Sequence, residues 1–113
     1  MSLLIVGSIA LDTIETPAGS VAEVPGGSTT YCSLAASYFV NPQIVGIVGE
    51  DFPASVRTLF SDHHIDQAGL STEPGKTFRW GGRYAANFDD RTTLFTEVNV
   101  FETFDPVLPQ AYR

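Results

Sequence analysis

The sequence predicts an α/β fold that carries a small β insertion, and two patterns support this prediction. Residues 3–9 and 43–48 form short, nearly continuous apolar runs, which are typical of strands buried inside a parallel sheet. Between them lie an alternating pattern, which indicates a β-hairpin with one face exposed to solvent, and a segment with helical spacing. Strands that alternate with helices indicate an α/β protein.

The hairpin is predicted at residues 14–24. Two alternating runs there flank the turn sequence Pro-Ala-Gly-Ser at 17–20, in which proline and glycine are strong turn signals. The sequence Pro-Gly-Gly-Ser at 25–28 then ends the β pattern.

The first helix is predicted at residues 28–40. One of the hydroxyl residues at 28–30 is expected to cap its N-terminus. Small residues at 35–37 would let the helix pack closely on a sheet. Asn41 is expected to end it, because the residue before a proline avoids the helical region. The apolar positions at helical spacing are Leu34, Ala35, Tyr38 and Phe39.

The second buried strand, at 43–48, ends at a glycine followed by two acids. Asp51 or a neighbour is expected to cap the next helix, with Pro53 in its first turn and its end near Asp62.

The remaining part of the chain has a different character. Residues 76–84 and 92–100 alternate, and 87–91 separate them as a turn, so we predict a second, largely exposed hairpin. This hairpin holds four of the six basic residues. Interleaved basic and aromatic residues would suit a nucleic-acid strand, but the acidic balance of the chain opposes that. A hairpin that covers a ligand or contacts a partner is the better interpretation. Residues 101–113 show no clear strand pattern.

The composition excludes several classes of function. The chain has 113 residues and a formal net charge of −7, which argues against nucleic acid or an anionic membrane surface as a partner. No apolar run approaches the roughly 20 residues of a membrane span, and no basic region of a signal peptide precedes the first strand. Cys32 is the single cysteine, which excludes an internal disulfide and a multi-cysteine metal site. We therefore expect a cytoplasmic protein.

Two sequence features are candidates for ligand binding. Asp12 comes just after the first apolar run, and ligands of open α/β sheets bind at the carboxyl ends of strands. Its carboxylate could accept hydrogen bonds from two neighbouring hydroxyls of a polyol, although an aspartate that begins a turn is equally consistent. Gly26 and Gly27 precede the first helix, where a backbone without side chains and the free N–H groups of the first turn can bind an oxygen-rich ligand. An ordinary glycine-rich turn is the alternative.

Three other features have plainer explanations. Asp51 follows a strand and a glycine, as a binding acid would, but a helix cap is the simpler explanation and the one we expect. His63 and His64 are adjacent, and adjacent residues on a regular element point apart, which argues against a shared metal ion. Cys32 is expected to be a small buried residue of the first helix.

Together these segments resemble the ribokinase-like PfkB carbohydrate kinases, a family that includes ribokinase, fructokinase and adenosine kinase. The resemblance rests on Ile-Val-Gly-Ser-Ile-Ala-Leu-Asp at 5–12, Pro-Gly-Gly-Ser at 25–28 and Val-Gly-Ile-Val-Gly-Glu-Asp at 45–51. It covers residues 2 to about 72 well and 76–101 more loosely.

The resemblance implies that residues 1–113 are the N-terminal portion of a PfkB-type kinase domain. That domain is a three-layer α/β/α sandwich with a small β-sheet lid. The implied core comprises 1–13 and 25–72, and the implied lid strands comprise 14–24 and 76–100.

The family transfers the γ-phosphoryl group of ATP to a hydroxyl of a sugar or nucleoside, so ATP and Mg²⁺ are implied for the complete enzyme and not for this segment. By resemblance, Asp12 would hold sugar hydroxyls, and Gly26 and Gly27 would lie against the sugar beside Ser28 and Tyr31. Many members carry asparagine where Tyr31 stands. The lid would exclude water, and a homodimer could form through it. No catalytic residue is expected, because the family's base lies in a Gly-Ala-Gly-Asp motif that these residues lack.

Two main hypotheses remain open from the sequence. The first is that the chain is the substrate-binding and lid half of a longer kinase, because two parallel strands do not complete an α/β sheet. The second is a self-standing, non-catalytic sugar-binding or interaction module. A nucleotide-binding domain of another class is a weaker third, since no phosphate-binding loop is present.

Overall fold

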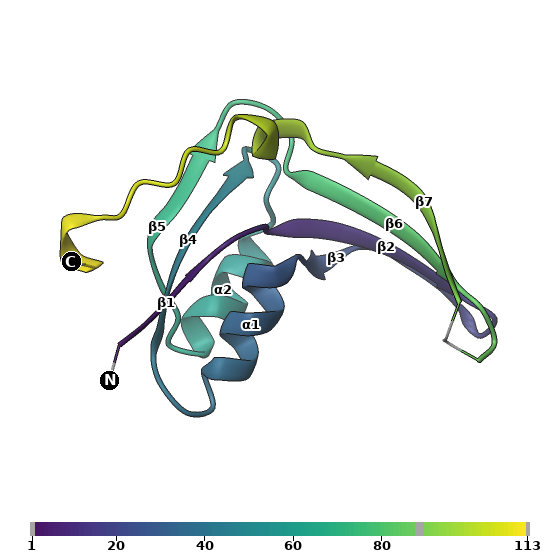
Figure 1. Ribbon diagram of the computed structural model, residues 1–113, viewed down its shortest axis with the longest axis horizontal. Coiled ribbons are helices and arrows are strands. Elements are labelled where there is room, and N and C mark those ends of the chain that lie inside the picture. The colour runs from purple at the N-terminus through teal and green to yellow at the C-terminus, as the bar shows by residue number, and fades with distance from the viewer. Residues whose placement is uncertain (1, 88–89, 113) are drawn as a thin grey trace.

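The computed structural model describes residues 2–87 and 90–112. They form two sheets, a three-stranded sheet with two helices on one face and a four-stranded sheet that extends away from it (Figure 1). The α/β prediction is confirmed. The elements are β1 (Leu3–Val6), β2 (Ala10–Thr16), β3 (Gly19–Gly26), α1 (Ser28–Ala36), β4 (Pro42–Gly49), α2 (Ala54–Asp62), β5 (Asp66–Glu73), β6 (Phe78–Tyr84), β7 (Arg91–Glu97) and the 3₁₀ turns η1 (Asn99–Thr103) and η2 (Gln110–Tyr112).

The three-stranded sheet, which we call the core sheet, has the order β1-β4-β5, and both pairings are parallel. The two apolar runs are therefore parallel neighbours with a helix between them, as predicted. The prediction that both strands are buried is confirmed for β4 but wrong for β1, which has a neighbour on one side only and buries only Ile5. Strand β5 was missed by the sequence reasoning. Its residues are mostly exposed, so it has no apolar run to reveal it. The Tyr112 hydroxyl supports it by accepting from the Gly69 backbone N–H at 3.1 Å.

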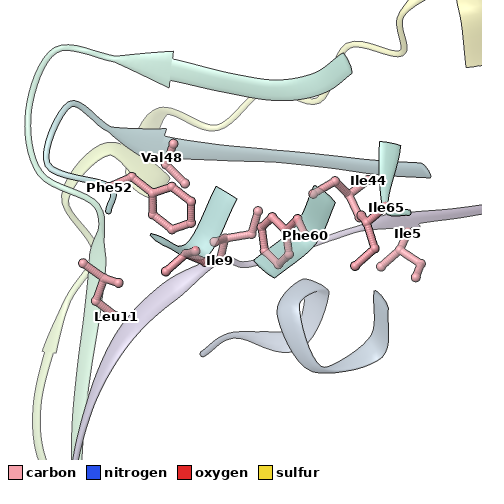
Figure 2. Close-up of a cluster of buried hydrophobic side chains, with 9 residues drawn as sticks. Ile5, Ile9, Leu11, Ile44, Val48, Phe52, Phe60 and Ile65 are labelled. Atoms are coloured by element: carbon pink, nitrogen blue, oxygen red, sulfur yellow. The ribbon is translucent and has the colours of Figure 1, made fainter. Parts of the chain in front are cut away.

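The hydrophobic core lies between the core sheet and the two helices (Figure 2). Phe60 of α2 is fully buried at its centre, and its ring packs against that of Phe52 with 6.4 Å between centroids. The buried cluster comprises Ile5, Ile9, Leu11, Ile44, Val48, Phe52, Val56, Phe60 and Ile65. The core therefore joins residues from both predicted apolar runs to the second helix.

Helix α1 differs from its prediction in length, cap and orientation. It ends at Ala36, and its N-cap is Gly27, without a side-chain cap. It buries Thr29, Thr30 and Ser33, whereas Cys32 is exposed, contrary to expectation. The apolar residues at 38 and 39 follow the end of the helix and are exposed. The hydrophobic spacing therefore does not mark the face that packs on the sheet.

The four-stranded sheet, which we call the lid sheet, has the order β3-β2-β6-β7. The β2–β3 and β6–β7 pairs are antiparallel hairpins, as predicted, and β2 and β6 join them in parallel. Strand β2 begins at Ala10 and β3 ends at Gly26. The lid sheet therefore includes residues that the sequence assigned to the core, Asp12 among them. Of the predicted turn at 87–91, Phe88 and Asp89 lie outside the described residues.

The two sheets are tied together by Asp51, which does not cap α2 as expected. Its Oδ1 accepts hydrogen bonds from the backbone N–H and the hydroxyl of Thr77, each at 2.8 Å. Its Oδ2 pairs with Arg79 at 2.7 Å, and Arg79 in turn makes a bidentate pair with Glu23 of β3. The N-cap of α2 is instead Pro53. Asp51 thus fixes the start of β6 next to the end of β4.

Within the described ranges, no helix has the length and apolar character that crossing a bilayer would require.

Candidate functional site

A pocket of about 260 Å³ lies where the lid sheet meets the N-terminus of α1. It gathers four of the five site residues predicted from the sequence, and the fifth, Gly26, packs directly against one of them. The lining residues are Asp12, Ile14, Gly27, Ser28, Tyr31, Trp80, Tyr84 and Arg91.

Strand register explains why residues distant in sequence share this pocket. Asp12 of β2 lies opposite Trp80 of β6, and Tyr84 lies opposite Arg91 of β7. Directly paired residues project from the same face, as do alternate residues along one strand. The side chains that line the pocket from this face are Asp12, Ile14, Trp80, Tyr84 and Arg91. The lid sheet therefore presents one continuous surface to a ligand.

Asp12 supplies a buried negative charge to the pocket. The residue is only 6% exposed, and no described residue donates a hydrogen bond to its carboxylate or forms an ion pair with it. Burial raises the pKa of Asp12, because removal from water disfavours the charged form. A buried charge without a partner is costly. Its oxygens are thus acceptors that the described fold leaves unused.

Gly26 and Gly27 bring the backbone close to this carboxylate and to Ser8. A Cβ at Gly26 would overlap the Asp12 carboxylate. Gly27 has a φ of +90°, and a Cβ there would lie 2.6 Å from the Ser8 carbonyl oxygen. Gly26 therefore requires glycine for space, and Gly27 requires it both for space and for its backbone conformation.

The first turn of α1 is only partly available to a ligand. The Ser28 N–H donates to the Ser8 hydroxyl at 3.1 Å, and the Thr29 N–H donates to the Ser8 carbonyl at 2.9 Å. The prediction of free N–H groups at this helix end is wrong for these two donors. Ser8 was not recognised from the sequence, since its role depends on the approach of the β1–β2 connection to the N-terminus of α1.

The walls of the pocket are aromatic. Tyr31 is 54% exposed, and partial burial, followed by the Asp12 carboxylate and the neighbouring Tyr84 phenol, raises the pKa of its hydroxyl. The hydroxyl therefore stays protonated and can donate. The Trp80 ring covers Gly82, where any side chain would collide with it. The Arg91 guanidinium lies over Trp80, 5.4 Å from the ring centroid.

Sequence reasoning missed four of the lining residues. The alternating aromatics of 76–84 gave a signal for Trp80 and Tyr84, because they marked a hairpin suited to cover a ligand. Arg91 gave none, since only the strand register brings it to this face. Ile14 shares a face with Asp12 because it lies two residues further along β2, but the sequence began that strand only at residue 14.

The other candidates lie elsewhere. His63 contacts the Leu59 carbonyl through Nδ1 at 2.9 Å and the edge of the Tyr38 ring. In the described part of the chain, no group of three or more His, Cys, Asp or Glu side chains could hold a metal ion.

No protein-family model matches the chain, and no curated protein matches it in sequence. Solved structures do match it. The nucleoside kinase of Burkholderia thailandensis in complex with inosine has a TM-score of 0.76 and 15% identity, over 91% of this chain and 37% of that one. The nucleoside kinase of Methanocaldococcus jannaschii, an archaeal member of the ribokinase family, has a TM-score of 0.73 and 18% identity, over 95% and 41%.

A third match is the ribokinase of Cryptococcus neoformans in complex with ADP, with a TM-score of 0.72 and 17% identity, over 87% of this chain and 34% of that one. The chain thus spans about two fifths or less of the length of these kinases. At such identities the similarity concerns the fold. The expected resemblance is confirmed at that level: this chain has the architecture of part of a ribokinase-like kinase.

Proposed function

We propose that this chain is the substrate-binding and lid part of an ATP-dependent sugar or nucleoside kinase of the PfkB type. The observation that carries the proposal is the Asp12 carboxylate, which is buried, lines the pocket and has no partner among the described residues. The solved structures of similar fold, which are sugar and nucleoside kinases, support the same assignment.

In this proposal the pocket binds and orients the phosphoryl acceptor. Asp12 accepts hydrogen bonds from two hydroxyls of the substrate, and the glycines at 26 and 27 let the substrate approach the backbone. The lid sheet excludes water, which would otherwise compete as the phosphoryl acceptor. Holding the acceptor hydroxyl in a fixed orientation is a large part of catalysis in phosphoryl transfer.

The phosphoryl donor binds outside this pocket. ATP and Mg²⁺ belong to the proposal for the complete enzyme, and we assign neither of them to residues 1–113. No catalytic base is assigned among residues 1–113. We also place the activity in the cytoplasm, as the composition predicts.

Binding of acceptors to the 113-residue chain tests the proposal. Trp80 is the only tryptophan in the sequence, and it lines the pocket, so its fluorescence reports directly on occupancy. We expect neutral polyols, sugar derivatives or nucleosides to change this signal. Asp12→Asn should weaken binding by roughly ten- to several-hundred-fold, because it removes the charge and one acceptor oxygen.

Asp62→Asn is the matched control, since Asp62 is exposed at the end of α2. It removes an equal charge far from the pocket residues in the fold and should leave affinity unchanged. Equal affinities for native and Asp12→Asn protein, with both folded, would refute the proposal.

A non-catalytic sugar-binding module would use the same pocket and the same Asp12. A coupled kinase assay distinguishes the two possibilities in a longer chain that contains this segment. Asp12-dependent phosphorylation of an acceptor supports the kinase, whereas Asp12-dependent binding without phosphorylation supports the module.

A further inference from the structure

Arg91 stands apart from the other arginines of the lid sheet. Arg79 pairs with Glu23 and Asp51, and Arg83 pairs with Glu15. No carboxylate among the described residues pairs with Arg91, whose guanidinium lies over the Trp80 ring and lines the pocket. Its positive charge therefore faces the space that a ligand would occupy.

The contact with Trp80 positions the guanidinium without using its hydrogen-bond donors. A cation over an aromatic face is attracted by the electrons of the ring, whereas its five N–H donors lie in the guanidinium plane. An arriving anion would not have to break a salt bridge to reach them. A carboxylate or phosphate matches this fork with two parallel hydrogen bonds, and a hydroxyl does not.

The two charges lie at different places along the lid sheet. Asp12 is level with Trp80, while Arg91 is level with Tyr84, four residues further along β6. This offset of four residues corresponds to about 13 Å along β6 between the levels of the Asp12 and Arg91 backbones. The Arg91 side chain extends back from there toward Trp80. A ligand in the pocket therefore meets a carboxylate on the Asp12 side and a guanidinium on the other. The volume of about 260 Å³ lies below that of pockets for drug-sized ligands.

We propose that Arg91 determines specificity, and that it selects a small polyol bearing an anionic group, either carboxylate or phosphate, at the end remote from Asp12. This inference rests on the proposed function, because it assumes that Asp12 binds the hydroxyls. In it, Asp12 recognises the polyol, and Arg91 distinguishes an anionic acceptor from a neutral sugar or a nucleoside.

Matched ligands test this specificity by titration of Trp80 fluorescence at low ionic strength. Glucitol, gluconate and glucitol 6-phosphate share a six-carbon polyol and differ in their terminal group, and inosine represents the neutral nucleosides. We expect at least one of the two anionic ligands to bind about ten-fold or more tightly than glucitol. Comparison of gluconate with glucitol 6-phosphate identifies which anion is preferred. The preference should decrease as salt is added, because Arg91 is exposed to solvent and ions screen such a charge.

Two charge-removing variants complete the design. Arg91→Gln should reduce the ratio of anion affinity to glucitol affinity from about ten-fold or more to about one. Arg83→Gln removes the same charge from the position of β6 next to Tyr84, which does not line the pocket. This variant should retain the preference for the anionic ligand. A second readout, isothermal titration calorimetry, separates affinity from any direct effect of Arg91 on the fluorescence of Trp80.

The outcomes separate this inference from the proposed function. If glucitol or inosine binds as tightly as both anions, with the affinity dependent on Asp12, the anionic preference is refuted and the proposed function stands. If the preference survives Arg91→Gln, Arg91 is not its determinant. If no ligand binds in an Asp12-dependent manner, both the inference and the proposed function fail.

Discussion

Replacement of Asp12 by asparagine should stabilise the fold while it weakens ligand binding. Asp12 is only 6% exposed as a residue, and no described residue compensates its charge. Burial of an unpaired carboxylate costs several kcal/mol, whereas an amide without partners costs about 1–3 kcal/mol. The difference predicts that Asp12→Asn raises the free energy of unfolding by about 1–2 kcal/mol at pH 7. The native protein would then keep a carboxylate that binds the ligand although it lowers the stability of the fold.

The stabilisation should depend on pH in a defined direction. Burial raises the pKa of Asp12 in the folded chain, so the folded state binds this proton more tightly than the unfolded state does. The destabilisation of the native protein is therefore fully present above the raised pKa and disappears as pH falls below the ordinary value of an aspartate. The stability difference between Asp12→Asn and native protein should shrink over that window.

Urea unfolding followed by far-UV circular dichroism measures both effects. A gain of 1 kcal/mol corresponds to roughly 4 °C in Tm for a domain of this size, so thermal unfolding provides a second measurement. Asp62→Asn, at an exposed position, should remain within about 0.5 kcal/mol of the native protein. A clear loss of stability in Asp12→Asn at pH 7 would show that the carboxylate has a structural partner, and would refute its role as an unused acceptor.

The remaining predictions concern the junction, the glycines and the exposed surface. Asp51→Asn should destabilise the chain by about 2–3 kcal/mol in urea unfolding, because hydrogen bonds to charged groups contribute roughly 1.5–3 kcal/mol each and the side chain is partly exposed. Although partial burial raises the pKa of Asp51, hydrogen bonds from Thr77 and Arg79 lower it overall. The stabilisation by Asp51 should therefore be present above the pKa of this aspartate in the unfolded chain, and it should be lost as the pH falls through its lower pKa in the folded chain. A stability difference that does not depend on pH would contradict the reasoning. Gly27→Ala should lower Tm, because alanine at a φ of +90° is strained and its Cβ would crowd the Ser8 carbonyl. An unchanged Tm would show that the turn can rearrange and would contradict this prediction. The chain should bind the dye ANS and self-associate at micromolar concentrations. Its exposed apolar residues include Tyr38 and Phe39, at 77% and 88% exposure, and the β7 edge of the lid sheet is open. A monodisperse, ANS-silent monomer in sedimentation analysis would contradict this. The 113-residue chain alone should show no ATP-dependent kinase activity in a coupled assay, and robust turnover would reveal catalytic residues that this assignment lacks.

The sequence by itself determined the features that depend on local pattern. The apolar run at 43–48 marked a buried strand, because burial on both faces requires apolar side chains throughout. The run at 3–9 also marked a strand, but the expectation of burial was wrong there, because β1 lies at the edge of the core sheet and buries only Ile5. The alternation at 14–24 and 76–100 marked two hairpins, because a half-exposed strand must alternate. Asp12 and the two glycines stood out because a lone acid and a glycine pair next to a strand have few local roles.

The tertiary structure alone decided which residues meet. Strand β5 has no apolar signature because most of its side chains are exposed, so only its pairing with β4 reveals it. Asp51 suits a helix cap by local rules, yet it binds Thr77 and Arg79, because the close approach at Gly49 brings the start of β6 within reach.

The pocket residues also divide into those that the sequence revealed and those that only the tertiary structure revealed. Asp12 lies in the lid sheet rather than beyond a core strand because the first apolar run divides, with β1 ending at Val6 and β2 beginning at Ala10. Its position opposite Trp80, and that of Tyr84 opposite Arg91, follow from strand register. The register of β2 on β6 is set by hydrogen bonds and packing between segments distant in sequence, and that of β6 on β7 by the turn between them. A shift of one residue would turn these side chains to the other face. Composition and periodicity contain no information on that choice, so the acid could be recognised from the sequence, but the arginine that shares its pocket could not.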